Sequence, residues 1–305
     1  MFRELKKEVS TPTEKHPTAR VWRQSDLKSV ITNIQKRELD ELKSTFPPAK
    51  DVIARMLDIG WVQPIPLESN TEKKAPTLFL LDMEATEEEL PEPWELLQAF
   101  KPSGVICYLG AASFHELTTQ VPTFYHIANL RPPSPDYTLD EIQSAKADSN
   151  EANQKRDPLG TLEFRFQGAD YYTTNRDKST IPGRQTRTRG TRTNLRMTTL
   201  EQTMLDTLWQ PLKFGGESIV FEVWERGVQV WNPEKMAKHL AAIGRPDWTR
   251  RVGAMLSIIG MEADGSLQRL LMESRKHVSG KESPLVLMPG LPASNLINEW
   301  GILSP

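Results

Sequence analysis

The sequence has few of the residues that build covalently linked or metal-held sites. It contains one cysteine, Cys107, and five histidines among 305 residues, which excludes an intramolecular disulfide and a cysteine-based zinc site. No run of 18 apolar residues is present, and residues 1–15 are charged and lack the apolar segment of a signal peptide. We therefore expect a cytoplasmic protein that needs no membrane, metal or other cofactor.

Neither sign of charge prevails over the whole chain. The 38 Lys and Arg residues and the 40 Asp and Glu residues leave a net charge of -2, which excludes a globally basic, histone-like protein. The charges are nevertheless unevenly distributed. Residues 1–50 hold 11 bases and 7 acids, residues 82–95 hold seven acids and no base, and residues 164–196 hold eight bases and two acids.

Catalytic signatures are missing from the sequence as well. Ser113 and His115 stand two residues apart on a predicted helix, where their side chains do not face each other, and no Gly-x-Ser-x-Gly elbow is present. Acid-x-Lys triplets such as Asp26-Leu27-Lys28 occur without a sheet pattern that would place an upstream acid beside them. No phosphate-binding glycine loop or calcium loop is found. We expect that the protein is not an enzyme.

The first 83 residues are divided by clear stop signals. Residues 1–20 are polar and interrupted by prolines, which predicts a flexible arm. Short helices are predicted over 25–34 and 36–43, and Pro47-Pro48 begins a third helix with an apolar stripe that ends at Gly60. Residues 61–67 and 77–82 are predicted to be extended. Three helices followed by two strands is the order of a winged helix-turn-helix, which we predict for residues 21–83.

The acidic segment 84–95 is predicted to be a linker to a second domain, residues 96–305. Within that domain residues 132–160 are predicted to be a loop or insert, and residues 175–196 a further loop. Thr198 and Glu201 are predicted to form the capping box of a helix. Extended segments are predicted over 104–108, 122–130, 162–166 and 170–174. Helices are predicted over 110–117, 198–208, 218–226, 233–244, 246–259 and 266–276. The predicted fold class is α+β, with the winged helix-turn-helix followed by a mixed, largely helical C-terminal domain.

Basic residues of the predicted winged helix-turn-helix and of residues 184–192 are candidates for contact with the DNA backbone. In a helix-turn-helix the last helix enters the major groove and the wing touches the backbone, so Lys50, Asp51 and Arg55 on helix 48–59 are candidates for base readout. Arginines recur every two or three residues over 184–192, a spacing that reaches successive phosphates. For both sets the alternative is an ordinary solvated surface, and for residues 184–192 a further alternative is a segment that binds an acidic protein partner. The predicted DNA-binding residues are Lys36, Arg37, Lys43, Lys50, Arg55, Lys73, Lys74, Arg184, Arg187, Arg189 and Arg192.

Tryptophans gather in the last third of the sequence, at positions 209, 224, 231, 248 and 300. Core packing explains most of them, and the alternative is that one or two are exposed anchors for a protein partner.

Three segments between residues 104 and 260 resemble the C-terminal domain of AbiEi-type antitoxins, from type IV abortive-infection toxin–antitoxin systems. Residues 197–208, followed by Pro211 and Gly215-Gly216, resemble the family pattern V-T-x-x-E-R/K-T-L-x-D-x-L, with Gln202 at the basic position. The stretch from Arg245-Pro246 through Arg250-Arg251-Val252-Gly253 to Leu256 is similar to R-R-x-G-x-L-L. Residues 111–122 resemble A-L-x-x-H-G-L-T-x-Q-x-P, with Glu116 at the glycine.

The resemblance implies a DNA-binding antitoxin that represses its own operon. The expected partners are double-stranded promoter DNA, bound by a monomer or weak dimer, and a nucleotidyltransferase-type toxin that is opposed without a stable complex. The alternative is a non-enzymatic protein-interaction subunit of a phage-defence system, which would use the tryptophan-rich helical third as its surface.

Overall fold

The computed structural model of the chain describes residues 2–42, 46–69, 74–81, 90–132, 159–189, 193–276, 278 and 284–305. These residues form ten α-helices and three sheets, so the fold class is α+β as predicted. The chain divides into two compact units. Unit 1 comprises residues 1–106, 162–172 and 186–196, and unit 2 comprises residues 107–161, 173–185 and 197–305. None of the described helices is long and apolar enough to cross a membrane.

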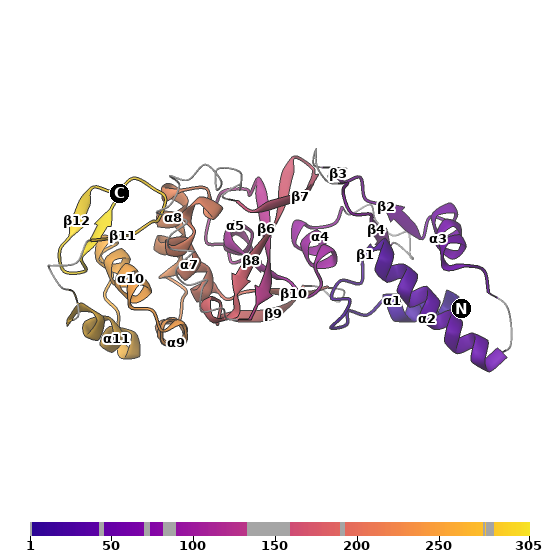
Figure 1. Cartoon of the computed structure of the whole chain (residues 1–305), viewed down its shortest axis with the longest axis horizontal. Coiled ribbons are helices and arrows are strands. Elements are labelled where there is room, and N and C mark those ends of the chain that lie inside the picture. Colours follow the sequence, from indigo (N-terminus) through magenta and orange to yellow (C-terminus); the bar gives the residue numbers. More distant parts are fainter. Residues whose placement is uncertain are drawn as a thin grey trace. The chain divides into compact units, whose positions relative to one another are not determined.

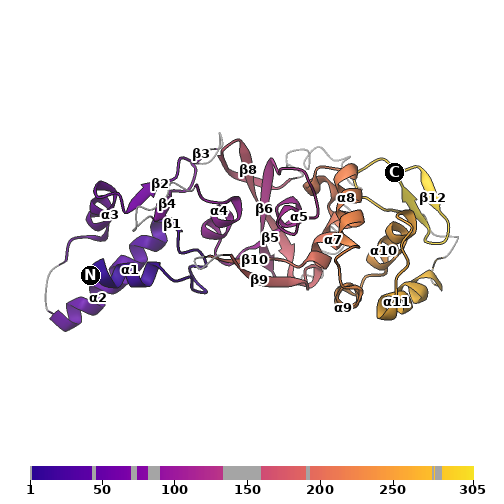
Figure 2. The same ribbon diagram turned by 180° about the vertical axis from the view of Figure 1, so that it is seen from behind.

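Three helices and a small sheet make up the described N-terminal part of unit 1 (Figures 1 and 2). The elements are α1 (Phe2–Val9), β1 (Val21–Arg23), α2 (Gln24–Leu42), α3 (Ala49–Asp58), β2 (Val62–Pro64) and β4 (Leu78–Leu81). Strand β4 lies between β1 and β2 and is antiparallel to both, with Leu80 opposite Val21 and Leu81 opposite Val62. Side chains from all three helices and all three strands share one hydrophobic core.

Two predictions for this region are wrong, one of a flexible arm and one of two short helices. Residues 2–9 form helix α1 instead of a flexible arm, because Leu5 and Val9 lie one turn apart on one face and are 0% and 1% exposed in the core. The two short helices predicted over 25–43 are one helix, α2, since no glycine or proline interrupts residues 24–42. The helix predicted after Pro48 is confirmed, with Val52, Ile53 and Met56 buried.

Helix α4 (Pro93–Phe100) occupies the end of the predicted acidic linker. Glu92 and Glu95 form a capping box at its start, in which each side chain accepts a hydrogen bond from the backbone of the other. Acids in a first turn also favour helix formation through the helix dipole, which explains why these two residues are not linker. The earlier part of the linker, residues 84–89, lies outside the described residues.

The largest sheet has the strand order β3-β7-β8-β6-β5-β10-β9. Its strands are β3 (Glu68–Ser69), β5 (Val105–Cys107), β6 (Phe124–Arg131), β7 (Thr161–Phe166), β8 (Ala169–Asp177), β9 (Arg184–Arg189) and β10 (Thr193–Thr198). The strands predicted around residues 106, 126, 164 and 172 are confirmed, whereas most of the loop predicted over 175–196 is strand. The loop prediction is wrong because β9 is an edge strand with a wholly polar sequence, so no apolar alternation reveals it. The predicted insert 132–160 lies almost entirely outside the described residues.

Unit 2 is built on buried helices and ends in a second small sheet. Its helices are α5 (Tyr108–Phe114), α7 (Leu200–Trp209), α8 (Glu217–Gly227), α9 (Pro233–Ile243), α10 (Pro246–Ile258) and α11 (Gly265–Lys276). Turns of 3-10 helix cover Lys178–Thr180 and Pro211–Phe214, and the final strands β11 (Leu285–Val286), β12 (Asn295–Ile297) and β13 (Ile302–Ser304) have the order β11-β13-β12. The C-terminal region is therefore mixed, and the prediction that it is largely helical is not confirmed.

The capping box predicted for Thr198 and Glu201 is wrong, because the N-cap lies one residue later and Glu201 accepts a hydrogen bond from the Asn232 backbone N–H at 3.1 Å. Thr199 is the N-cap of α7 and accepts a hydrogen bond from the backbone N–H of Gln202 at 3.2 Å. Thr198 instead ends strand β10 and contacts Thr203 through its hydroxyl at 2.8 Å. Two adjacent threonines offer the same capping chemistry, so the sequence does not distinguish them.

Four of the five C-terminal tryptophans are core residues. Trp224, Trp248, Trp300 and Trp209 are 0%, 3%, 4% and 7% exposed, and only Trp231 is partly exposed. The rings of Trp209 and Trp248 stack with their centroids 4.9 Å apart. A tryptophan-lined docking surface in the helical third is therefore not supported.

Candidate nucleic-acid interface

The N-terminal helices of unit 1 expose part of the predicted basic set. Lys36 and Arg37 are exposed on α2, and Lys50 and Arg55 on α3. Arg37 forms an ion pair with Glu8 of α1, whereas no described residue pairs with Lys36, Lys50 or Arg55. Lys43 lies outside the described residues.

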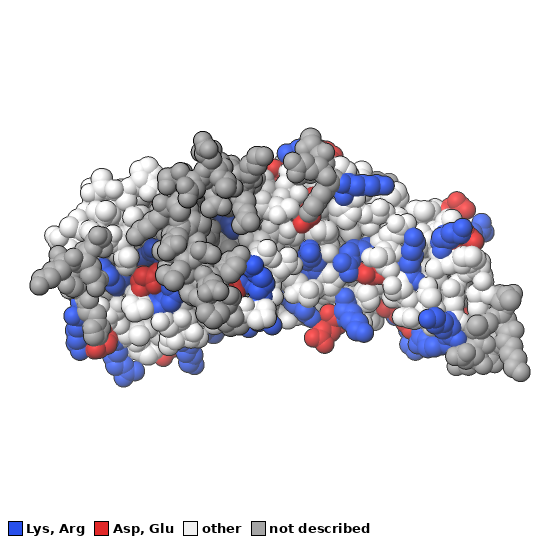
Figure 3. All heavy atoms as spheres, in the orientation of Figure 1, with Lys and Arg blue, Asp and Glu red and all other residues white. Residues whose placement is uncertain are grey.

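The exposed face of α3 is electrically balanced. Besides Lys50 and Arg55 it carries Asp51 and Asp58, both exposed. Over α1 to α3 the space-filling view likewise shows Lys and Arg side chains interspersed with Asp and Glu (Figure 3). A helix of this composition can contact phosphates through its bases, while its acids can accept from base donors such as the cytosine amino group.

The segment between β2 and β4 is partly held in place. Its residues Glu68 and Ser69 pair as β3 with Arg165 and Phe164 of β7, and the hydroxyl of Ser69 accepts a hydrogen bond from the backbone N–H of Ala75 at 2.9 Å. Lys74 is exposed beyond this pairing, and Lys73 lies outside the described residues.

The arginine-rich segment is one strand of a pair, which we call the arginine hairpin and define as β9 and β10. The strands are neighbours in the sheet and are joined by residues 190–192. Successive side chains of a strand point to opposite faces, so Arg187 and Arg189 share one face of β9 and Arg184 lies on the other. All three arginines are exposed, and Arg192 lies outside the described residues. The expected flexible loop is thus an ordered edge strand.

Glu92 of helix α4 binds the last arginine of β9. Nε of Arg189 lies 2.5 Å from Oε2 of Glu92, and Nη2 donates to Oε1 at 2.7 Å, which is bidentate geometry. The guanidinium carbon also lies 5.2 Å from the ring centroid of Trp94. No described residue pairs with Arg184 or Arg187.

Further contacts connect residues 186–196 of the arginine hairpin to the rest of unit 1. The Thr193 hydroxyl donates to Oε1 of the buried Glu95 at 2.7 Å, and the Arg196 backbone N–H donates to Oε1 of the buried Gln98 at 2.7 Å. The Asn194 N–H donates to the Pro17 carbonyl at 2.8 Å, next to an isolated bridge between residues 18 and 193. The N-terminal basic zone and the hairpin residues 186–196 therefore belong to one compact unit, whereas Arg184 falls in unit 2.

Sequence reasoning missed the role of α4. Glu92, Glu95 and Gln98 recur every three residues, a spacing that places side chains on neighbouring turns of one helix face. That spacing was the available signal, and the surrounding run of acids obscured it.

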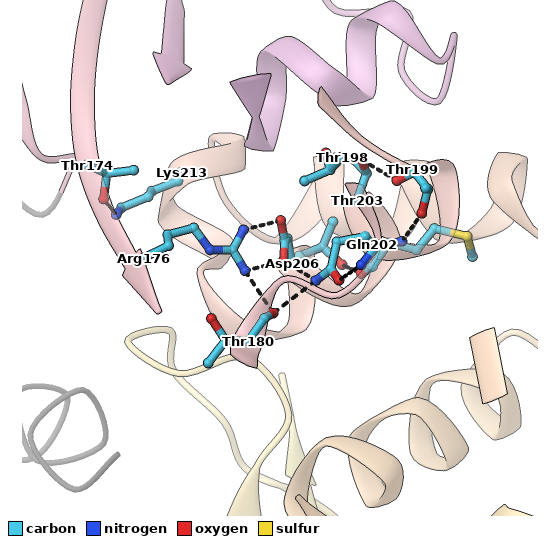
Figure 4. A network of polar contacts seen from close by, with 12 residues as sticks. Thr174, Arg176, Thr180, Thr198, Thr199, Gln202, Thr203, Asp206 and Lys213 are labelled. Atoms are coloured by element: carbon cyan, nitrogen blue, oxygen red, sulfur yellow. Dashed lines mark hydrogen bonds and ion pairs between the residues drawn. The ribbon is translucent and has the colours of Figure 1, made fainter. Parts of the chain in front are cut away.

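The residues of the first resemblance form a buried polar network in unit 2 (Figure 4). Arg176 of β8 donates to Asp206 of α7 through Nη1 at 2.5 Å and through Nη2 at 2.8 Å. Gln202 donates from Nε2 to Asp206 at 2.9 Å and to the Thr180 carbonyl at 3.2 Å. Burial alone lowers the pKa of Arg176, but the Asp206 carboxylate raises it above the ordinary value, so the guanidinium stays charged.

This network is closely packed around Gly183. A Cβ atom at that position would lie 2.6 Å from Nε2 of His239 and 2.7 Å from Cβ of Gln202. The glycine N–H donates to the Gln202 side chain at 3.0 Å, so the close approach is used for a hydrogen bond. The network therefore fixes β8 against α7 and has the properties of a structural site.

The second resembling segment attaches the C-terminal strands. Arg250 donates to the carbonyls of Trp300 at 2.9 Å and Gly301 at 3.0 Å, and Arg251 donates to that of Val286 at 2.9 Å. A Cβ at Gly253 would lie 2.5 Å from two carbons of the Trp300 ring. Burial lowers the pKa of Arg251 to about 10, and Asp247 opposes that change.

The third segment is also explained by packing. His115 contacts the Thr198 carbonyl through Nε2 at 2.8 Å, so its ring has a structural use. Thr118 and Thr119 donate their hydroxyls to Glu222 of α8 at 2.7 Å and 2.8 Å. Burial raises the pKa of Glu222, but these hydrogen bonds bring it below the ordinary value.

Two buried titratable groups of unit 2 are held in their neutral forms. Burial raises the pKa of the Cys107 thiol to about 12 and lowers the pKa of His126 to about 3. Within the described ranges, no group of three or more His, Cys, Asp or Glu side chains is arranged to hold a metal ion.

Comparisons with known proteins give a fold and no function. No protein family matches the chain, and no curated protein matches it. Among solved structures the chain is similar to the RV2827C protein from Mycobacterium tuberculosis, with a TM-score of 0.50, 15% identity, and coverage of 93% of this chain and 86% of that one. At this identity the likeness concerns the fold alone.

Proposed function

We propose that the protein is a DNA-binding regulator of the AbiEi antitoxin type, which occupies the promoter of its own operon. The observation that carries the proposal is the make-up of unit 1. It combines the α1-β1-α2-α3-β2-β4 order with exposed basic side chains that no described residue neutralises. The proposed contacts in the described part of unit 1 are Lys36, Lys50, Arg55, Lys74 and Arg187.

In this proposal residues 2–81 act as a winged helix. Helix α3 enters the major groove, and Lys50 and Arg55 on its exposed face contact phosphates or guanine. Lys74, between β2 and β4, takes the place of a wing residue on the backbone. The role of the protein is binding and not catalysis, and the nucleotidyltransferase-type toxin is opposed through this regulation and by the C-terminal domain.

The segments of unit 2 that resemble the antitoxin family support the proposal because their motif residues have structural roles. Asp206, Gln202, Arg250 and Gly253 all serve the packing of the described unit. Motifs that maintain a fold are compatible with a non-enzymatic antitoxin domain, and they leave DNA contact to unit 1.

The test is a salt series of binding to duplex DNA from the region upstream of the gene, with a scrambled duplex of equal length as the control. The expected result is tighter binding to the upstream duplex, with log K falling linearly in log salt by about 0.9 per phosphate contacted. Equal and salt-independent binding to the two duplexes would overturn the proposal. A Lys50→Gln and Arg55→Gln double variant is expected to lose selectivity, whereas Lys238→Gln on α9 of unit 2, also exposed, is expected to keep it.

A further inference from the structure

The two arginines on one face of β9 have different electrostatic surroundings. Arg187 is exposed, and no described residue pairs with its side chain. Arg189, two residues further on, is bound by both oxygens of Glu92 and lies against the ring of Trp94. In the sequence the two are equivalent, because both belong to the same basic run.

We infer that Arg187 is the phosphate contact of the arginine hairpin, and that Glu92 and Trp94 withhold Arg189 from DNA. This inference rests on the proposed function and assigns different roles to residues of the same site. The difference between the two arginines is the charge that each leaves available to a phosphate.

The Arg189 charge is already balanced by a carboxylate at 2.5 Å. A cation strengthens DNA binding when it releases counterions from the phosphates it neutralises. A phosphate that approached Arg189 would also approach Glu92, and the repulsion between the two anions offsets the attraction to the guanidinium.

The hydrogen-bond donors of Arg189 are also in use. A bidentate carboxylate uses the donor fork that would otherwise hold a phosphate, and the aromatic ring covers one face of the guanidinium. The side chains of Arg189 and Glu92 are 47% and 35% exposed, so water screens the attraction between their charges. The contact of the Arg189 guanidinium with the Trp94 ring further stabilises the pair. Arg187 lies on the same face without such a competitor, which leaves its five donors available.

The experiment measures the salt dependence of binding to the upstream and scrambled duplexes by the full chain and three variants. Arg187→Gln removes the proposed contact. The charge-balanced double variant Glu92→Gln with Arg189→Gln removes the pair without changing the net charge. Lys238→Gln is the matched control for the loss of one exposed cation in unit 2.

We expect Arg187→Gln to weaken binding to both duplexes by about tenfold and to reduce the salt slope by about 1. The double variant and Lys238→Gln are expected to stay within about threefold of the wild type with an unchanged slope. Thermal unfolding of each variant checks that the fold is retained. If the double variant is unfolded, the comparison of Arg187→Gln with Lys238→Gln decides the role of Arg187.

The failure of the inference is distinguishable from that of the proposed function. If the wild type binds with a salt slope and Arg187→Gln has the same slope, Arg187 is not the contact. If the double variant loses about one unit of slope, Arg189 contacts DNA and Glu92 does not withhold it. If the wild type itself binds neither duplex, the proposed function and this inference are both overturned.

Discussion

Arg176 in unit 2 and Arg187 in unit 1 belong to the same basic stretch of sequence, yet their environments are opposite. The side chain of Arg176 is 4% exposed and paired with Asp206, whereas Arg187 lies on an exposed strand and has no partner among the described residues. A buried charge requires a partner because its desolvation costs several kcal/mol, while an exposed charge remains available to an external anion. The positions of the acids, and not the density of arginines, therefore separate structural residues from candidate contacts.

The largest effect is expected at Asp206. Replacement by alanine leaves the Arg176 guanidinium buried without its carboxylate, and we expect the free energy of unfolding to fall by about 3–5 kcal/mol. Chemical denaturation of wild type and variant measures this change. The control is the double variant Arg176→Met with Asp206→Leu, which is expected to recover most of the stability because no unpaired charge remains. A loss below about 1 kcal/mol for the single variant would show that Arg176 has other sufficient partners.

Gly253 tests whether helix α10, which carries Arg250 and Arg251, also serves the packing of unit 2. A Cβ at this position would lie 2.5 Å from two ring carbons of Trp300, so the ring or the helix must move. We expect Gly253→Ala to lower the free energy of unfolding by about 1–3 kcal/mol, the usual cost of overpacking a core.

A double-mutant cycle with Trp300→Leu checks the origin of that loss. If the clash is the cause, the double variant is less destabilised than the sum of the two single variants. Strict additivity would place the cause of the loss elsewhere.

His126 tests how burial in the interior of unit 2 changes the pKa of an imidazole ring. Its folded pKa is about 3, below the ordinary value of 6.5, because burial disfavours the imidazolium. As the pH falls, His126 is protonated in the unfolded chain before it is protonated in the folded one. The stability due to the neutral ring is therefore present above pH 6.5 and lost as the pH falls towards 3. We expect a contribution of about 1.4 kcal/mol per pH unit, or roughly 2 kcal/mol between about pH 6.5 and 5.

The measurement is urea denaturation at several pH values, compared between wild type and His126→Gln. Glutamine keeps an N–H donor for the Leu159 carbonyl, which Nε2 of the histidine contacts at 2.9 Å. Burial also lowers the pKa of His16 and His239, so some pH dependence remains in the variant. An unchanged slope would show that His126 is not the residue responsible.

The contrast between buried and exposed elements also explains what could be predicted from the sequence. Helices with proline or asparagine at the start and glycine at the end, such as α9, are predicted almost to the residue because these signals act within a few residues. Buried strands such as β7 are recognised by alternating Phe164 and Phe166. The edge strand β9 is not, since it contains no apolar residue, and α1 is missed because Leu5 and Val9 alone among its described side chains are buried.

The candidate site is less predictable than the fold. The positively charged residues are found by counting, but their availability depends on acids that are distant in sequence, such as Glu92 for Arg189, 97 positions away. A single sequence does not reveal such pairs. The support that α4 gives to the arginine hairpin is hidden for the same reason, because Gln98 and Arg196 are 98 positions apart.

The smallest effects are expected at two neighbouring residues on α2. Arg37 forms an exposed ion pair with Glu8, with 60% and 33% of the side chains exposed, whereas Lys36 has no partner among the described residues. An exposed pair of this kind contributes up to about 1 kcal/mol, so Arg37→Gln is expected to change the free energy of unfolding only slightly.

On DNA the two residues are expected to differ in the salt slope. Lys36→Gln should reduce it by about 1 if this lysine meets a phosphate. The charge-balanced pair Glu8→Gln with Arg37→Gln should leave it unchanged, because the Arg37 charge is already neutralised by the carboxylate. Equal losses for the two variants would mean that pairing does not decide which cations reach DNA, and the distinction drawn between Arg187 and Arg189 would then lose its physical basis.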